Sequence, residues 1–178
     1  AVLYSLGSKA ITYVLLLVFA NLYLATDYGR ASFAFNLRNI VMLVVFLGLP
    51  DALIPFITRK KKFADITTSL FIVTLLVTIT GFYLSLERPW LVPLIITFPL
   101  VMLTSIAMAF WRARERYDIP MKVGFYSIVV TFVAAYLLKG AGSLGVVSAY
   151  ALGNLFAFVA TCYPLKKELL AATKGTFS

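Results

Sequence analysis

The chain has 178 residues, of which 62% are hydrophobic and 13% charged, and its formal net charge is +9 at pH 7. Soluble domains are about 45–50% apolar and about 25% charged, so this composition excludes a soluble fold. The chain contains no His and a single Cys, Cys162. An internal disulfide is therefore excluded, and the commonest metal ligand and general base are missing. We expect no enzymatic activity, no metal site and no cofactor.

Six apolar runs follow one another along the chain, at about 3–24, 33–57, 66–86, 90–111, 121–138 and 144–165. Each is about as long as a transmembrane helix and apolar on all sides, whereas a β-barrel needs alternating segments of about ten residues. The sequence therefore predicts an all-α, polytopic membrane helical bundle of about six transmembrane helices. Residues 1–178 are expected to form a single lobe. Because the first residue is Ala1 and not Met, we expect some upstream residues to be missing.

The basic residues are unequally divided between alternate loops. Twelve of the 16 fall on one side of the predicted bundle, namely Lys9, Arg59, Lys60, Lys61, Lys62, Arg112, Arg114, Arg116, Lys122, Lys166, Lys167 and Lys174. The other side has Arg30, Arg38, Arg88 and Lys139. Positively charged loops stay in the cytoplasm, so we expect a multi-pass protein of the plasma or inner membrane, in contact with membrane lipids, with both ends cytoplasmic. The same rule accounts for the positive charge, and no nucleic-acid partner is expected.

Polar side chains within the apolar runs are the candidate binding residues, because such groups are costly in lipid and usually face the interior of a bundle. The second predicted helix contains Asn36, Arg38 and Asn39, the first contains Asn21, and the sixth contains Asn154. On an ideal helix Asn36 and Asn39 share a face, while Arg38 points roughly away from Asn36. This geometry argues against one combined site.

Two alternatives apply to each charged candidate. Arg38 either faces a cavity and donates two parallel hydrogen bonds to a phosphate, or it extends along the helix to the outer headgroups. Arg30 has the same alternatives and lies closer to the surface. Asp51 either binds a coupling proton or sodium ion, or pairs with the basic cluster at 59–62.

Prolines and small residues mark how the helices pack. Prolines at 50, 55, 93 and 99 are expected to bend the second and fourth helices, which would then either line a cavity or pack tightly. Gly145, Ala149 and Gly153 recur at spacing four in the sixth helix. Small residues at this spacing let membrane helices approach closely, so they predict a packing seam.

Three stretches, taken in order, resemble the polysaccharide flippases of O-antigen type in the multidrug/oligosaccharidyl-lipid/polysaccharide exporter superfamily. The first is Leu-Ala-Thr-Asp-Tyr-Gly at 24–29, interpreted as the acidic-Tyr-Gly turn between the first two helices and followed by 46–53 and basic residues. The second is Phe-Trp-Arg-Ala-Arg-Glu-Arg-Tyr at 110–117, and the third is Gly-Ala-Gly-Ser-Leu-Gly-Val at 140–146.

The resemblance implies two pseudo-symmetric six-helix lobes around a basic cavity that moves a polyprenyl-pyrophosphate-linked oligosaccharide across the bilayer by alternating access. This chain looks like the first lobe, with the second supplied by the same polypeptide or by a homodimer partner. Arg30 and Arg38 are the outer-half arginines that the resemblance assigns to the pyrophosphate. The multidrug branch tends to use a carboxylate in the first helix, where this chain has Asn21, so drug export is less supported. A vitamin-binding membrane subunit is the alternative that the chain's size allows.

Overall fold

The structure, a computed structural model, describes residues 14, 17–46, 49–58 and 64–166. Within this part of the chain, all regular elements are helices. They are α2 (Ala25–Phe46), α3 (Leu49–Thr58), α4 (Ala64–Ser85), α5 (Val92–Ala113), α6 (Asp118–Leu137) and α7 (Gly142–Cys162), with the short 3-10 helices η1 (Pro89–Leu91) and η2 (Lys139–Ala141). The predicted all-α architecture is confirmed.

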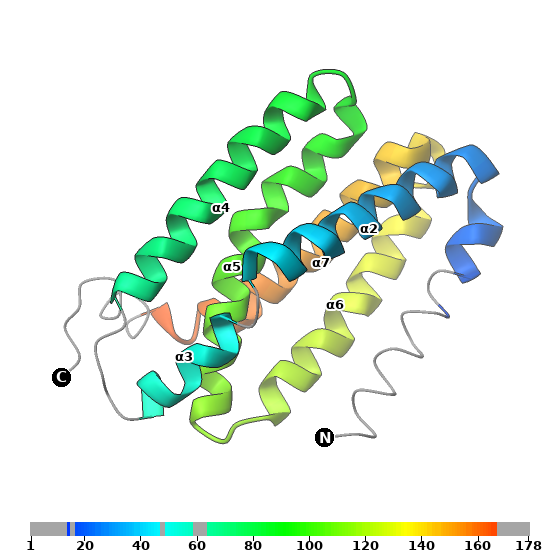
Figure 1. Cartoon of the computed structure of the whole chain (residues 1–178). Coiled ribbons are helices and arrows are strands. Elements are labelled where there is room, and N and C mark those ends of the chain that lie inside the picture. The colour runs from blue at the N-terminus through cyan, green and yellow to red at the C-terminus, as the bar shows by residue number, and fades with distance from the viewer. Residues whose placement is uncertain (1–13, 15–16, 47–48, 59–63, 167–178) are drawn as a thin grey trace.

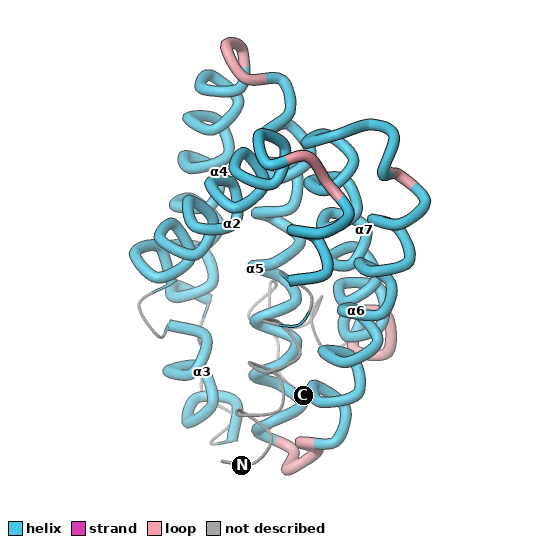
Figure 2. Tube along the Cα trace, turned by 90° about the vertical axis from the view of Figure 1, so that its right-hand side faces the viewer, coloured by secondary structure: helices cyan, strands magenta, loops and turns pink. Residues whose placement is uncertain are grey.

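The long helices form two antiparallel hairpins, α4–α5 and α6–α7, which meet where α5 contacts α7 (Figure 1). Helix α2 lies along α7, and α3 packs against α5. In the view turned by 90°, α2 and α4 occupy one side and α6 the other, with α5 between them (Figure 2). The face where α2, α5, α6 and α7 come together is the one that holds the candidate site.

Four helical segments in the described part of the chain are long and apolar enough to cross a membrane: Thr68–Ser85, Pro89–Ala113, Asp118–Leu137 and Lys139–Cys162. They match the last four predicted spans. Helix α4 exposes Leu75, Leu76 and Ile79, each at 58–60% of its maximal area. An apolar face of this kind is stable next to lipid and unfavourable in water. The protein is an all-α membrane helical bundle.

The first two predicted spans need correction. Of the first, residues 14 and 17–22 are helical, residues 23 and 24 are not, and the rest lies outside the described residues. The second, predicted as one helix at 33–57, is divided into α2 and α3. Pro50 is the second residue of α3, where its missing N–H removes no hydrogen bond, so it starts a helix there instead of bending one. Pro55 and Pro99 do lie inside helices.

The stretch predicted as an acidic-Tyr-Gly turn is also helical. The chain breaks at Tyr23 and Leu24 instead, and α2 begins at Ala25 with Asp27 in its first turn. A carboxylate is favourable there because the N-terminal end of a helix carries partial positive charge. The turn residues therefore act as the start of the helix.

Buried apolar clusters occupy both ends of the bundle. One contains Leu53, Met102 and Phe110 and joins α3, α5 and the end of α7. The others contain Phe19, Leu94 and their neighbours, near the start of α2, α5 and α7. Along α7, the residues that line the cavity described below lie between these clusters.

Helix α7 forms the predicted packing seam. Gly145, Ala149 and Gly153 are all buried. A Cβ atom added at Gly153 would overlap Thr131 Oγ1 of α6, and one at Gly145 would overlap the carbonyl of Leu138. Only glycine permits this close approach of α6 and α7.

Candidate functional site

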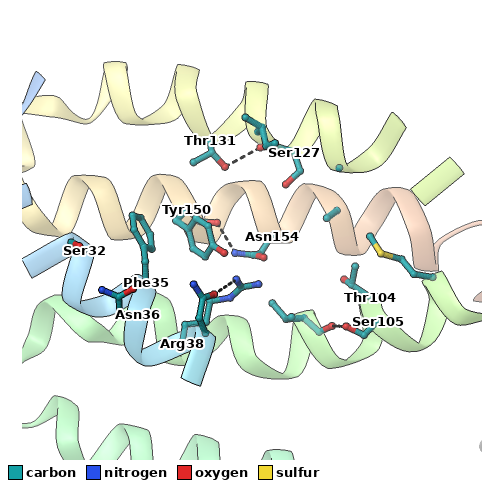
Figure 3. A pocket seen from close by; sticks show the side chains of 16 residues that line it. Ser32, Phe35, Asn36, Arg38, Thr104, Ser105, Ser127, Thr131, Tyr150 and Asn154 are labelled. Carbon is teal, nitrogen blue, oxygen red and sulfur yellow. Dashed lines mark hydrogen bonds between the residues drawn. The ribbon is translucent and has the colours of Figure 1, made fainter. Parts of the chain in front are cut away.

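A cavity of about 560 Å³ lies between α2, α5, α6 and α7 (Figure 3). Its volume falls in the range of about 300–1,000 Å³ that is usual for small-molecule sites. Apolar surface makes up most of its wall, and all four helices also contribute polar side chains: Ser32, Asn36, Arg38 and Asn39 from α2, Thr104 and Ser105 from α5, Ser127 and Thr131 from α6, and Tyr150 and Asn154 from α7. In such a site the apolar wall excludes water from the ligand and the polar groups fix its orientation.

Arg38 is the only charged side chain among the described residues that line the cavity. It is half-buried, and its Cζ atom lies 5.0 Å from the centre of the Tyr150 ring. Phe35 packs against the same ring, with 4.7 Å between the ring centres and an angle of 55°. The three side chains group together from α2 and α7 (Figure 3). A guanidinium over an aromatic face is attracted by the ring's negative potential, so Tyr150 holds Arg38 toward the cavity.

The hydrogen bonding of Arg38 is incomplete. Its Nη1 atom donates to Asn39 Oδ1 over a long 3.4 Å. Its Nε atom is buried, and no acceptor for it exists in the described part of the chain. Leaving a buried donor without a partner costs about 1–3 kcal/mol, and more for a charged group. An anion bound beside Nε would remove this cost.

The hydroxyl and amide groups on the other helices have a common property. Each donates a hydrogen bond of 2.7–2.9 Å to a backbone carbonyl of the protein. The side chains are Thr104, Ser105, Ser127, Thr131 and Asn154. Because a hydroxyl has one proton and two lone pairs, and an amide has a separate carbonyl oxygen, these groups keep acceptors available for a ligand. The cavity thus combines a cationic donor on α2 with neutral acceptors on α5, α6 and α7.

The structure brings together three of the predicted substrate-binding residues. Asn36, Arg38 and Asn39 all line this cavity, and Asn154 lines it from α7. The helical geometry argues against one combined site for Asn36 and Arg38, yet both residues line this cavity. Of the two alternatives for the second and fourth predicted helices, a cavity lining or tight packing, the structure shows that α2 and α5 both contribute residues to a cavity.

The remaining predicted residues lie elsewhere. Asn21 is exposed, and its Nδ2 donates to the carbonyl of Leu17 at 2.8 Å. Arg30 is exposed and lines a second cavity nearer the start of α2. Asp51 belongs to α3, but its side chain lies outside the part that the structure describes, so its predicted ion-coupling role stays a prediction.

Several lining residues carry no recognisable signal in the sequence. Ser127 and Thr131 were missed because hydroxyl groups are common in membrane helices, where most bond to the backbone of their own helix. Thr131 does so, whereas Ser127 donates to the carbonyl of Gly153 in α7. Tyr150 was missed because an aromatic residue in an apolar run is ordinary. In the described ranges, no group of three or more Cys, Asp or Glu side chains is placed to hold a metal ion.

Comparison with known proteins gives no match: no family model, no curated protein and no solved structure is similar to this chain.

Proposed function

We propose that the chain is one lobe of a membrane flippase that translocates a polyprenyl-pyrophosphate-linked oligosaccharide for cell-surface polysaccharide biosynthesis. The observation that carries the proposal is Arg38, whose buried Nε has no acceptor in the described part of the chain and lies on a cavity among membrane helices. The three sequence stretches that resemble O-antigen flippases support it. The proposed orientation, with both chain ends cytoplasmic, follows from the distribution of Lys and Arg.

In this proposal the pyrophosphate binds at Arg38. The planar guanidinium donates through Nε and a terminal nitrogen to two phosphate oxygens, which is the bidentate geometry that arginine favours. The half-buried position of Arg38 makes the attraction stronger than it would be for a fully exposed cation. The sugar hydroxyl groups donate to the acceptors left free at Ser127, Thr131 and Asn154. Charge on one wall and neutral acceptors on the other orient the lipid-linked sugar.

The size of the cavity limits what one lobe can hold. About 560 Å³ admits the pyrophosphate and the sugar next to it, and the rest of the glycan has to extend beyond this lobe. A second six-helix lobe, from the same polypeptide or from a second copy, would complete the enclosure. Relative movement of the two lobes then opens the site to either side of the membrane.

Transport by the complete protein in proteoliposomes tests the proposal. We expect the parent protein to transport a polyprenyl-pyrophosphate glycan and Arg38→Ala to slow this transport at least tenfold. Arg38→Lys should retain part of the rate, because Lys keeps the positive charge but cannot donate two parallel hydrogen bonds from a planar group. Lys139→Gln is the matched control, because Lys139 is a cation packed on Tyr136 outside the cavity. Transport of a drug but no glycan by the parent protein would instead favour a multidrug exporter of the same superfamily.

The cavity volume also favours a second candidate, a substrate-binding membrane subunit of a vitamin transporter. Such a subunit binds its ligand without flipping it. Tight binding of a vitamin by this chain, together with dependence of transport on a partner ATPase, would replace the flippase proposal.

A further inference from the structure

A second cavity, of about 600 Å³, lies where the first turns of α2 meet the turn between α4 and η1. Its wall includes Arg30, Phe33, Glu87, Arg88 and Trp90. The proposed flippase cavity shares none of these residues. Along α2, Arg30 precedes Arg38 by eight residues, which corresponds to about 12 Å of helix axis.

The side chains of this second cavity form an ordered group. The Cζ atom of Arg88 lies 5.6 Å from the centre of the Phe33 ring. Phe33 and Trp90 meet edge to face, with 6.3 Å between ring centres and an angle of 68°. The aromatic pair therefore joins α2 to η1, and its Phe33 ring packs against the guanidinium of Arg88. Arg88 is held by its ring contact while its donors stay exposed.

The charges in this cavity are unbalanced. The cavity is lined by two guanidinium groups, of Arg30 and Arg88, and by one carboxylate, of Glu87. Within the described ranges, no ion pair joins Glu87 to either arginine. The net positive potential, the exposed donors and the aromatic wall all suit an anionic group attached to an apolar body.

The position of the cavity in the membrane indicates which apolar molecule carries the anionic group. One membrane-spanning segment ends at Ser85 and the next begins at Pro89, so the cavity lies at the boundary between the apolar core and the headgroups. Half-buried Trp90 is at the depth where indole rings favour the headgroup region. We propose that this cavity binds the headgroup of a phospholipid with net negative charge, with Arg30 and Arg88 donating to its phosphate oxygens and Phe33 and Trp90 packing against the lipid beside it. The site is independent of the flippase proposal.

Quenching of Trp90 fluorescence by brominated lipids tests this site. The chain has two Trp residues, so Trp111→Phe leaves Trp90 as the single reporter. The full chain is placed in phosphatidylcholine nanodiscs that contain equal fractions of either brominated phosphatidylglycerol or brominated phosphatidylcholine. We expect phosphatidylglycerol to quench Trp90 several-fold more strongly. The double variant Arg30→Gln/Arg88→Gln should lose this preference, and Arg30→Gln alone, at an exposed position, should lose part of it.

Lys139→Gln is the control, because Lys139 is a cation outside this cavity, and it should keep the full preference. Equal quenching by both lipids in the parent chain would overturn the proposal. So would loss of the preference in Lys139→Gln, which would assign it to general surface charge. If added inorganic phosphate abolished the preference for phosphatidylglycerol, the site would bind a soluble anion and the lipid assignment would be overturned. A preference that survives this competition supports the lipid.

Discussion

The backbone N–H of Ser143 donates a hydrogen bond of 3.0 Å to Asp27 Oδ1, across 116 positions of sequence. Asp27 lies in the first turn of α2, and Ser143 is the second residue of α7, so one carboxylate serves the N-terminal ends of two helices. Nearby, the hydroxyl of Tyr23 donates to the carbonyl of Ala135 in α6 at 2.6 Å. These two contacts fix the start of α2 against the α6–α7 hairpin and so position one wall of the cavity.

Asp27→Ala should destabilise the bundle by about 1–2 kcal/mol, because it leaves the Ser143 N–H at the start of α7 without its acceptor and removes a favourable charge from the first turn of α2. Asp27→Asn keeps an acceptor oxygen and should lose less. Thermal unfolding in detergent, followed by intrinsic fluorescence, measures both. Equal melting temperatures for Asp27→Ala and the parent protein would show that this contact does not hold α2 in place.

Gly142→Ala should destabilise the protein for two reasons. Gly142 has a φ of 56°, which is unfavourable for a residue with a side chain, and an added Cβ would lie 3.0 Å from Asp27 Oδ2. Gly140→Ala is the matched control two residues away, since its Cβ would meet nothing within 4 Å. We expect Gly142→Ala to lose about 1–2 kcal/mol and Gly140→Ala to lose much less. Similar melting temperatures for both variants would contradict this prediction.

Gly153→Ala should separate α6 from α7, because its Cβ would overlap Thr131 Oγ1 and lie 2.9 Å from the carbonyl of Ser127. Overpacking of this kind costs about 1–3 kcal/mol. Adding Thr131→Ala removes the first clash and leaves the second, so the double variant should recover part of the loss. Gly29→Ala, with nothing within 4 Å, is the neutral control. No recovery in the double variant would mean that Thr131 is not the obstructing group.

The ring of Tyr150, and not its hydroxyl, should matter for binding at Arg38. Tyr150→Phe keeps the aromatic face that supports the guanidinium and should bind a polyprenyl pyrophosphate as well as the parent chain does. Tyr150→Leu removes that face and should weaken binding several-fold, since exposed and partly desolvated cation–π contacts contribute about 0.5–2 kcal/mol. Equal affinities of the Tyr150→Leu and Tyr150→Phe variants for the polyprenyl pyrophosphate would show that Tyr150 does not position Arg38.

The sequence predicts the four long apolar helices well, because an all-round apolar run of about 20 residues has few alternatives. It also identifies the glycine seam of α7, since spacing alone determines which small residues meet a neighbour. It fails at the division of the second predicted span, because one proline, Pro50, can either bend a helix or begin one, and tertiary packing decides between them.

The candidate site was predictable only in part. Asn36, Arg38 and Asn39 stand out because polar groups are rare in apolar segments. Their presence in one cavity, and the contact of Arg38 with Tyr150, depend on the packing of α2 against α7, which no local pattern encodes. Arg88 and Phe33 were missed for the same reason: they are far apart in sequence and meet only in the folded bundle.

Binding of polyprenyl pyrophosphate to the chain in nanodiscs tests the central claim most directly. The uncharged polyprenyl alcohol serves as the reference ligand. The parent chain and Lys139→Gln should bind the pyrophosphate much more tightly than the alcohol, and Arg38→Gln should lose roughly tenfold or more of that affinity, as expected for a charge-assisted hydrogen bond of about 1.5–3 kcal/mol. Unchanged affinity in Arg38→Gln, or equal affinity of the parent chain for the two lipids, would contradict the assignment of this cavity to a pyrophosphate.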